Sequence, residues 1–85
     1  MKLHAVMKKP KSNLSADILM VEYGHGWIVK SQLIDDNPGN SRLISFDNDI
    51  YQDLDTAQTR FYEVVGTYAV LGCVVTHFKD GGEDL

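Results

Sequence analysis

The strongest constraint on how this chain folds is a pair of strand-like segments separated by two glycines. Residues 17–23 and 27–34 are both rich in Ile, Val, Leu and aromatic side chains, and Gly24-His25-Gly26 lies between them. This arrangement is typical of a β-hairpin, in which the loop length decides which residues share a face. A loop of three residues predicts a largely apolar face with the opposed pairs Tyr23–Trp27, Val21–Val29 and Leu19–Ser31.

The other face of this hairpin is mixed in character. In the same register, Met20 and Ile28 lie on it together with Glu22 and Lys30. One apolar face and one mixed face are expected of an antiparallel sheet with one side toward water. In a three-residue loop we expect Gly26 to have a positive φ, a conformation that glycine adopts without strain.

A third strand and a helix follow the hairpin. Pro38-Gly39 fits the two central positions of a type II turn, and residues 42–46 then make the third strand. Farther along, apolar side chains recur at three- and four-residue spacing. They predict one buried helical face made by Leu54, Ala57, Phe61, Val64, Val65 and Tyr68.

The two ends of this helix are open to more than one interpretation. Asp55 with Gln58 three residues later matches a capping box, and Asp53 is the alternative N-cap. Gly66 costs about 1 kcal/mol inside a helix, so the helix either stops there or continues to Leu71.

The predicted order of elements is strand, strand, strand, helix, strand (β-β-β-α-β), because residues 73–78 form one more apolar, β-branched segment. A helix packed on a three-stranded antiparallel meander buries both apolar surfaces, so the fold class is α+β. Residues 3–7 are either a short edge strand or a frayed end. We expect a single domain over residues 1–85, with a basic arm and linker at 1–16, a folded core at 17–78 and an acidic tail at 79–85.

Composition excludes several classes of protein. With 8 Lys and Arg against 12 Asp and Glu, the 85-residue chain has a formal charge of −4. One cysteine, Cys73, rules out a disulfide framework and a thiolate zinc site, and we expect it to be buried. No segment approaches the roughly 20 apolar residues of a membrane span. The basic N-terminus lacks the apolar run of a secretory signal, which favours the cytoplasm.

Catalytic and ligand-binding motifs are missing from the sequence. Asp47-Asn48-Asp49 resembles the start of a calcium loop, but Tyr51, Gln52 and Gln58 occupy the positions that need an oxygen ligand, glycine and glutamate. No phosphate-binding glycine loop and no nucleophile–base pair can be placed. We therefore expect no enzyme, no metal and no cofactor.

The segment from residue 35 to residue 63 is acidic, with seven carboxylates and two arginines. Because such a segment repels phosphate, we expect neither direct nucleic-acid binding nor binding to a membrane. It suits a protein that occupies a basic nucleic-acid-binding surface on another protein. The predicted contact residues are Asp47, Asp49, Asp53, Asp55, Arg60 and Tyr62, with His25, Met20 and Ile28 as secondary candidates.

The sequence thus favours a small non-enzymatic protein-binding module, an inhibitor or modulator of a larger host protein or nucleic-acid-handling complex. A phage or mobile-element origin would fit this role. The alternatives are a homodimeric accessory protein that associates through its mixed sheet face, and a small-molecule binder.

Overall fold

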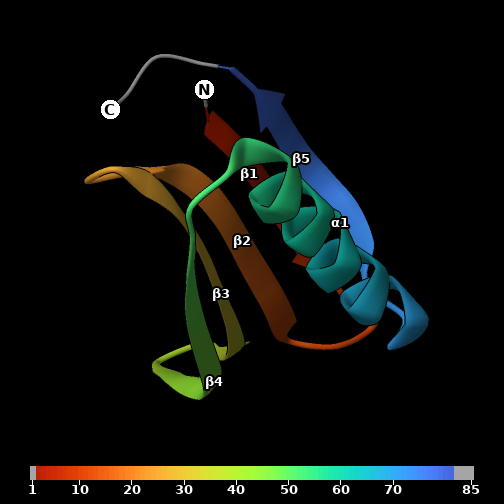
Figure 1. The fold of residues 1–85 in the computed structure, drawn as a ribbon. Coiled ribbons are helices and arrows are strands. Elements are labelled where there is room, and N and C mark those ends of the chain that lie inside the picture. The colour runs from red at the N-terminus through yellow and green to blue at the C-terminus, as the bar shows by residue number, and fades with distance from the viewer. Residues whose placement is uncertain (1, 82–85) are drawn as a thin grey trace.

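In the part of the chain that the structure describes, five antiparallel strands form one sheet and a single helix lies on it (Figure 1). The computed structural model describes residues 2–81. Neighbours in the sheet follow the order β4-β3-β2-β1-β5. The elements are β1 (Lys2–Lys8), β2 (Leu14–Tyr23), β3 (Gly26–Asn37), β4 (Asn40–Tyr51), α1 (Leu54–Val70) and β5 (Val74–Asp80).

The chain is a small α+β domain, but four strands precede the helix, so the predicted β-β-β-α-β order is wrong. The extra strand is β1, which pairs with β2 on one side and with β5 on the other. Leu3, Ala5 and Met7 are at most 1% exposed, so this segment belongs to the core and not to an arm. Its alternating pattern is weak in sequence because only these three positions are buried, and one of its two partner strands, β5, lies at the far end of the chain. Of the predicted acidic tail, residues 82–85 lie outside the described residues.

The β2–β3 hairpin has a turn of two residues, so the predicted register is wrong. Tyr23 pairs with Gly26, and Gly24 carries the positive φ of 60° in place of Gly26. A shift of one residue exchanges the faces of a strand. Met20 therefore pairs with Val29, points toward the helix and is 0% exposed, so its predicted place on the wetter face is also wrong.

Gly26 is needed for a different reason than the one predicted. A side chain at this position would collide with the backbone carbonyl of Tyr51 in β4. The close approach of β3 to β4 at this corner thus depends on glycine.

The second hairpin agrees with the prediction at its turn and differs in its length. Gly39 has a φ of 77°, which suits the third position of a type II turn after Pro38. Strand β4, however, continues to Tyr51, so residues 47–51 are strand where we expected a polar connection.

The core lies between α1 and the helix-facing side of the sheet. Ala57, Phe61 and Val64 are buried, which confirms the predicted helical face, and they pack with Leu3, Met7, Ile18 and Met20. The helix continues through Gly66 to Val70, and the predicted burial of Cys73 is confirmed at 5% exposure. In residues 2–81 no helix is long and apolar enough to cross a membrane.

The N-terminus of α1 is capped by Asp53, which decides between the two caps that the sequence left open. The backbone N–H of Thr56 donates to Asp53 Oδ2 at 2.9 Å, and the Thr56 hydroxyl donates to Oδ1 at 2.8 Å. Asp55 lies inside the first turn, where its charge still favours the positive end of the helix dipole.

Phe61 and Phe46 give a matched test of this packing. Phe61 is 0% exposed and Phe46 is 58% exposed. We expect Phe61→Ala to lower the free energy of unfolding by about 3–5 kcal/mol and Phe46→Ala by less than about 1 kcal/mol. Urea unfolding followed by circular dichroism measures both, and equal losses would contradict the assignment of the core.

Candidate binding surfaces

The sheet has one covered face and one uncovered face. Helix α1 lies over one side, and the alternate residues of each strand point to the other, which we call the open sheet face. One residue from each strand defines it, in the order β1 to β5: Lys2, Leu19, Ile28, Phe46 and Lys79. The open sheet face carries exposed apolar side chains and a hollow.

Large apolar side chains gather on the open sheet face along β4 and at the end of β2. Tyr23, Leu43, Phe46 and Ile50 are between 57% and 62% exposed. Ile50 lies opposite Ile28, and Leu43 lies opposite Ile34. Exposed apolar side chains grouped in this way mark an interaction surface more often than scattered ones do.

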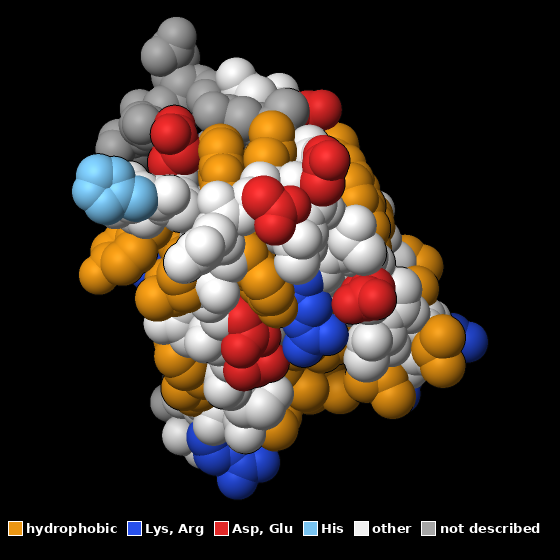
Figure 2. Space-filling model, in the orientation of Figure 1, with side chains coloured by type: hydrophobic (Ala, Val, Ile, Leu, Met, Phe, Trp, Pro, Cys, Tyr) orange, Lys and Arg blue, Asp and Glu red, His pale blue; other side chains and the backbone are white. Residues whose placement is uncertain are grey.

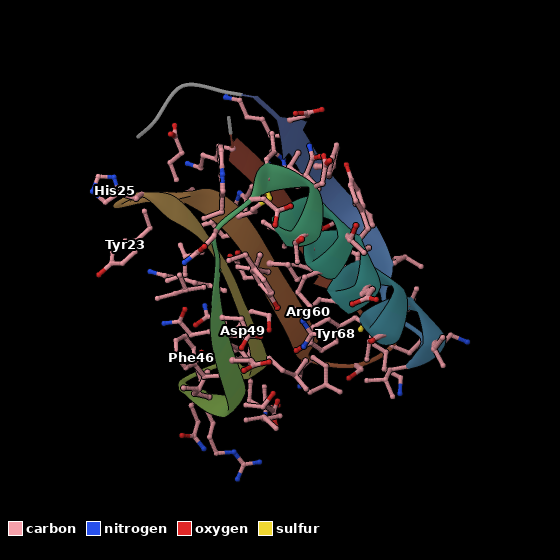
Figure 3. All side chains as sticks on the ribbon, viewed as in Figure 1. Tyr23, His25, Phe46, Asp49, Arg60 and Tyr68 are labelled. Atoms are coloured by element: carbon pink, nitrogen blue, oxygen red, sulfur yellow. The ribbon has the colours of Figure 1, made fainter. Side chains whose placement is uncertain are left out.

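Two hollows flank these apolar side chains. The first, about 260 Å³, lies on the open sheet face and is lined by Asp17, Leu19, Lys30, Ser31, Gln32 and Phe46. The second, about 540 Å³, lies at the tip of the β2–β3 hairpin, where Tyr23, His25, Ile50 and Gln52 contribute to its walls. Figure 3 shows Tyr23 and His25 together at this tip, away from the helix. Both hollows are open to solvent and suit a side chain of a partner better than an enclosed ligand.

The predicted acidic residues are on the helix side and are partly engaged within the molecule. Arg60 of α1 reaches across to β4, with Nη2 3.5 Å from Asp47 Oδ2 and Nε 3.7 Å from Asp49 Oδ2. Its Nη1 lies 3.7 Å from Glu63 Oε1. In Figure 3, Asp49 and Arg60 face each other between the strand and the helix, and Figure 2 shows this side with acidic side chains predominating.

One arginine does not neutralise three carboxylates, and the remaining negative charge affects the pKa of the neighbouring Tyr51. Burial first, and then the negative charge of Asp49, raise the pKa of the Tyr51 hydroxyl above its ordinary 10.0, with Arg60 acting in the opposite direction. The helix side therefore has a negative potential of moderate strength, since exposed ion pairs are also screened by salt.

The other predicted contact residues are dispersed. Asp53 serves as the helix cap and Asp55 lies in the first turn. Tyr62 is 51% exposed and stands edge-on to Phe61 with ring centroids 5.2 Å apart. Because residues two apart on a helix point in different directions, Tyr62 does not share a surface with Arg60. Ile28 is on the open sheet face but only 5% exposed.

The contribution of β4 to the open sheet face was not predicted from the sequence. Phe46, Asn48 and Ile50 point one way, and Asp47 and Asp49 point the other. This period-two alternation is present in the sequence. The acidic composition of residues 47–53 nevertheless led to the prediction of a polar connection there.

A small polar cluster lies at the other end of the open sheet face. His4 Nε2 is 2.8 Å from Asp17 Oδ1, and the rings of His4 and His77 stand edge to face with centroids 5.7 Å apart. Within the described residues, no three His, Cys, Asp or Glu side chains are arranged to hold a metal ion.

The free edges of the sheet are bulged. Ile44 is an extra residue in β4, and Thr76 is an extra residue in β5. Bulges at edge strands oppose pairing with another strand. The open sheet face is thus a better candidate for binding than either edge.

Comparisons of the chain with protein-family models, with curated proteins and with solved structures found no match.

The Asp53 cap makes a prediction about pH. Hydrogen bonds from the backbone and the hydroxyl of Thr56 hold the pKa of the Asp53 carboxyl below its ordinary 3.8. A depressed carboxyl pKa stabilises the folded state above the ordinary value, and this contribution is lost as pH falls through the lowered value. We expect Asp53→Asn, which removes the negative charge at the positive end of the helix dipole, to lower the midpoint of thermal unfolding at pH 7, and the difference from wild type to shrink below about pH 4.

Asp55→Asn is the matched control, because it removes a carboxylate from the same turn without touching the cap. A pH-independent difference for Asp53→Asn, or an equal effect of Asp55→Asn, would contradict this account of the cap.

Proposed function

We propose that this protein is a non-enzymatic protein-binding module that acts through its open sheet face, as an inhibitor or modulator of a larger protein. The observation that carries the proposal is the group of four apolar side chains, Tyr23, Leu43, Phe46 and Ile50, each more than half exposed on one side of the sheet. Leaving such a group in water is unfavourable by roughly 25 cal/mol for each Å² of apolar surface. A partner that buries it gains this free energy.

The nature of these side chains favours a protein as the partner. Tyrosine and other aromatic residues are enriched at the centres of protein interfaces, and the neighbouring open-face side chains on β3 and β4 include both aliphatic residues and the polar Lys30, Gln32 and Asn48. A flat face with two shallow hollows accepts protruding side chains of another protein, whereas most small molecules are bound in deeper, more enclosed pockets.

The acidic helix side supports the proposal less strongly than its composition suggested. Arg60 binds Asp47 and Asp49, and Thr56 binds Asp53, so these carboxylates have intramolecular roles. A surface that imitates spaced phosphates would leave them free for a basic partner. They can still contribute long-range attraction to such a partner.

The proposal is tested by partner capture from a lysate of the native host, with quantification by mass spectrometry. We expect wild-type bait to retain a partner whose recovery falls about tenfold or more with Phe46→Ser combined with Ile50→Ser, because truncating interface anchors costs about 1–2 kcal/mol or more each.

Tyr62→Ser combined with Val70→Ser is the matched control, since it removes two exposed apolar side chains from the helix side. Equal recovery with both double variants, or no retained protein at all, would contradict a docking role for the open sheet face. Light scattering accompanies the capture. A dimer that Phe46→Ser with Ile50→Ser converts to a monomer would assign the face to self-association instead.

A further inference from the structure

We infer that the partner of the open sheet face is an acidic protein segment that presents carboxylates beside apolar side chains. This inference rests on the proposed function and adds the chemistry of the partner. It reverses the expectation from composition, which pointed to a basic partner.

The charges of the chain are divided between the two sides of the sheet. Among residues 2–81, the open sheet face carries four lysines, Lys2, Lys8, Lys30 and Lys79, against two carboxylates, Asp17 and Asp36. The helix side carries eight of the ten carboxylates in residues 2–81 and two arginines. The net charge of −4 therefore conceals a face of the opposite sign.

The two carboxylates on the open sheet face already have partners. Asp17 accepts a hydrogen bond from His4, and Asp36 accepts one from the Ser41 hydroxyl at 2.6 Å. No lysine on this face, within the described residues, lies within 4.0 Å of a carboxylate oxygen. Their ammonium groups are thus available to a partner.

Two lysines stand at the ends of one row of side chains that crosses four strands of the open sheet face. Lys79, His4, Leu19 and Lys30 follow one another in a cross-strand row, and Phe46 lies on β4 beside the hollow that Lys30 and Leu19 also line. Strands spaced about 4.8 Å apart place the two lysines about 14 Å from each other. An acidic segment with apolar side chains can fill the hollow and reach both lysines.

The same charges weigh against the other occupants. A second copy that docked face to face would bring lysines against lysines, which opposes the homodimer. Single-stranded nucleic acid needs successive aromatic platforms, whereas the two large exposed aromatic rings of this face, Tyr23 and Phe46, are on strands that are not neighbours.

The test uses the full ¹⁵N-labelled chain and two short synthetic peptides with the same leucines, one alternating with glutamate and one with lysine. We expect the glutamate peptide to bind about tenfold or more tightly than the lysine peptide at low salt, with the preference falling as salt rises. The perturbed amides should lie around the hollow, in β2, β3 and β4, and around Lys79 in β5. Equal affinities, or a preference for the lysine peptide, would overturn the inference.

Charge reversal at Lys30→Glu with Lys79→Glu should remove the preference, and Lys11→Glu, in the β1–β2 connection, should leave it intact. Oligothymidylate is the third probe. If it binds with the same dependence on Lys30 and Lys79 and the glutamate peptide does not bind, the face belongs to nucleic acid and the inference fails. Sedimentation that shows a face-to-face dimer of the chain alone would overturn it as well.

The same charge reversal in the capture experiment separates the two proposals. If recovery of the natural partner depends on Phe46 and Ile50 but not on Lys30 and Lys79, the docking role stands and the acidic partner is wrong. If recovery is indifferent to Phe46 and Ile50, the docking role itself fails.

Discussion

Within residues 2–81, a single helix buries the apolar side of a five-stranded sheet, and Phe61 is at the centre of this packing. The size of the helix therefore determines how much of the sheet remains exposed. An α-helix with its side chains is about 10 Å wide, whereas five strands extend over about 19 Å. One helix therefore covers part of one face. Within the described residues, no helix covers the other face, and Tyr23, Leu43, Phe46 and Ile50 on it stay more than half exposed to water.

This incomplete coverage has a counterpart in the charges. Arg60 ties α1 to the acidic side of β4, and the lysines of β1, β3 and β5 point away from it. The domain is therefore acidic on the side where the helix is anchored and basic where the sheet is open. On the open sheet face, the lysines can attract an acidic partner over a long range, and the apolar side chains can be buried once the partner has bound.

Much of the local structure could be predicted from the sequence. The helical face through Phe61, the turn at Gly39 and the burial of Cys73 were all correct, because each depends on residues that are close in the chain or on one strong preference. The hairpin at Gly24 was located correctly but shifted by one residue. Two flanking glycines allow either loop length, so local preference did not decide between them.

The candidate site was harder to predict, because it depends on which residues from separate strands share a face. The register moved Met20 from its expected place on the mixed face into the core, whereas Ile28 kept its face, and residues 2–8 lie in the sheet between β2 and β5. Residues 47–51 joined a strand because β3 offered them a partner, although their acidic composition favoured a loop.

The sequence by itself determined the fold class, the position of the helix and the lack of any recognisable catalytic motif, since these follow from periodicity and residue type. Only the tertiary structure decided which face of the sheet is open and which charges accompany the exposed apolar side chains. The physical reason is that strand faces alternate residue by residue. The composition of a surface is therefore set by pairing between distant segments, and the average charge of the chain does not describe it.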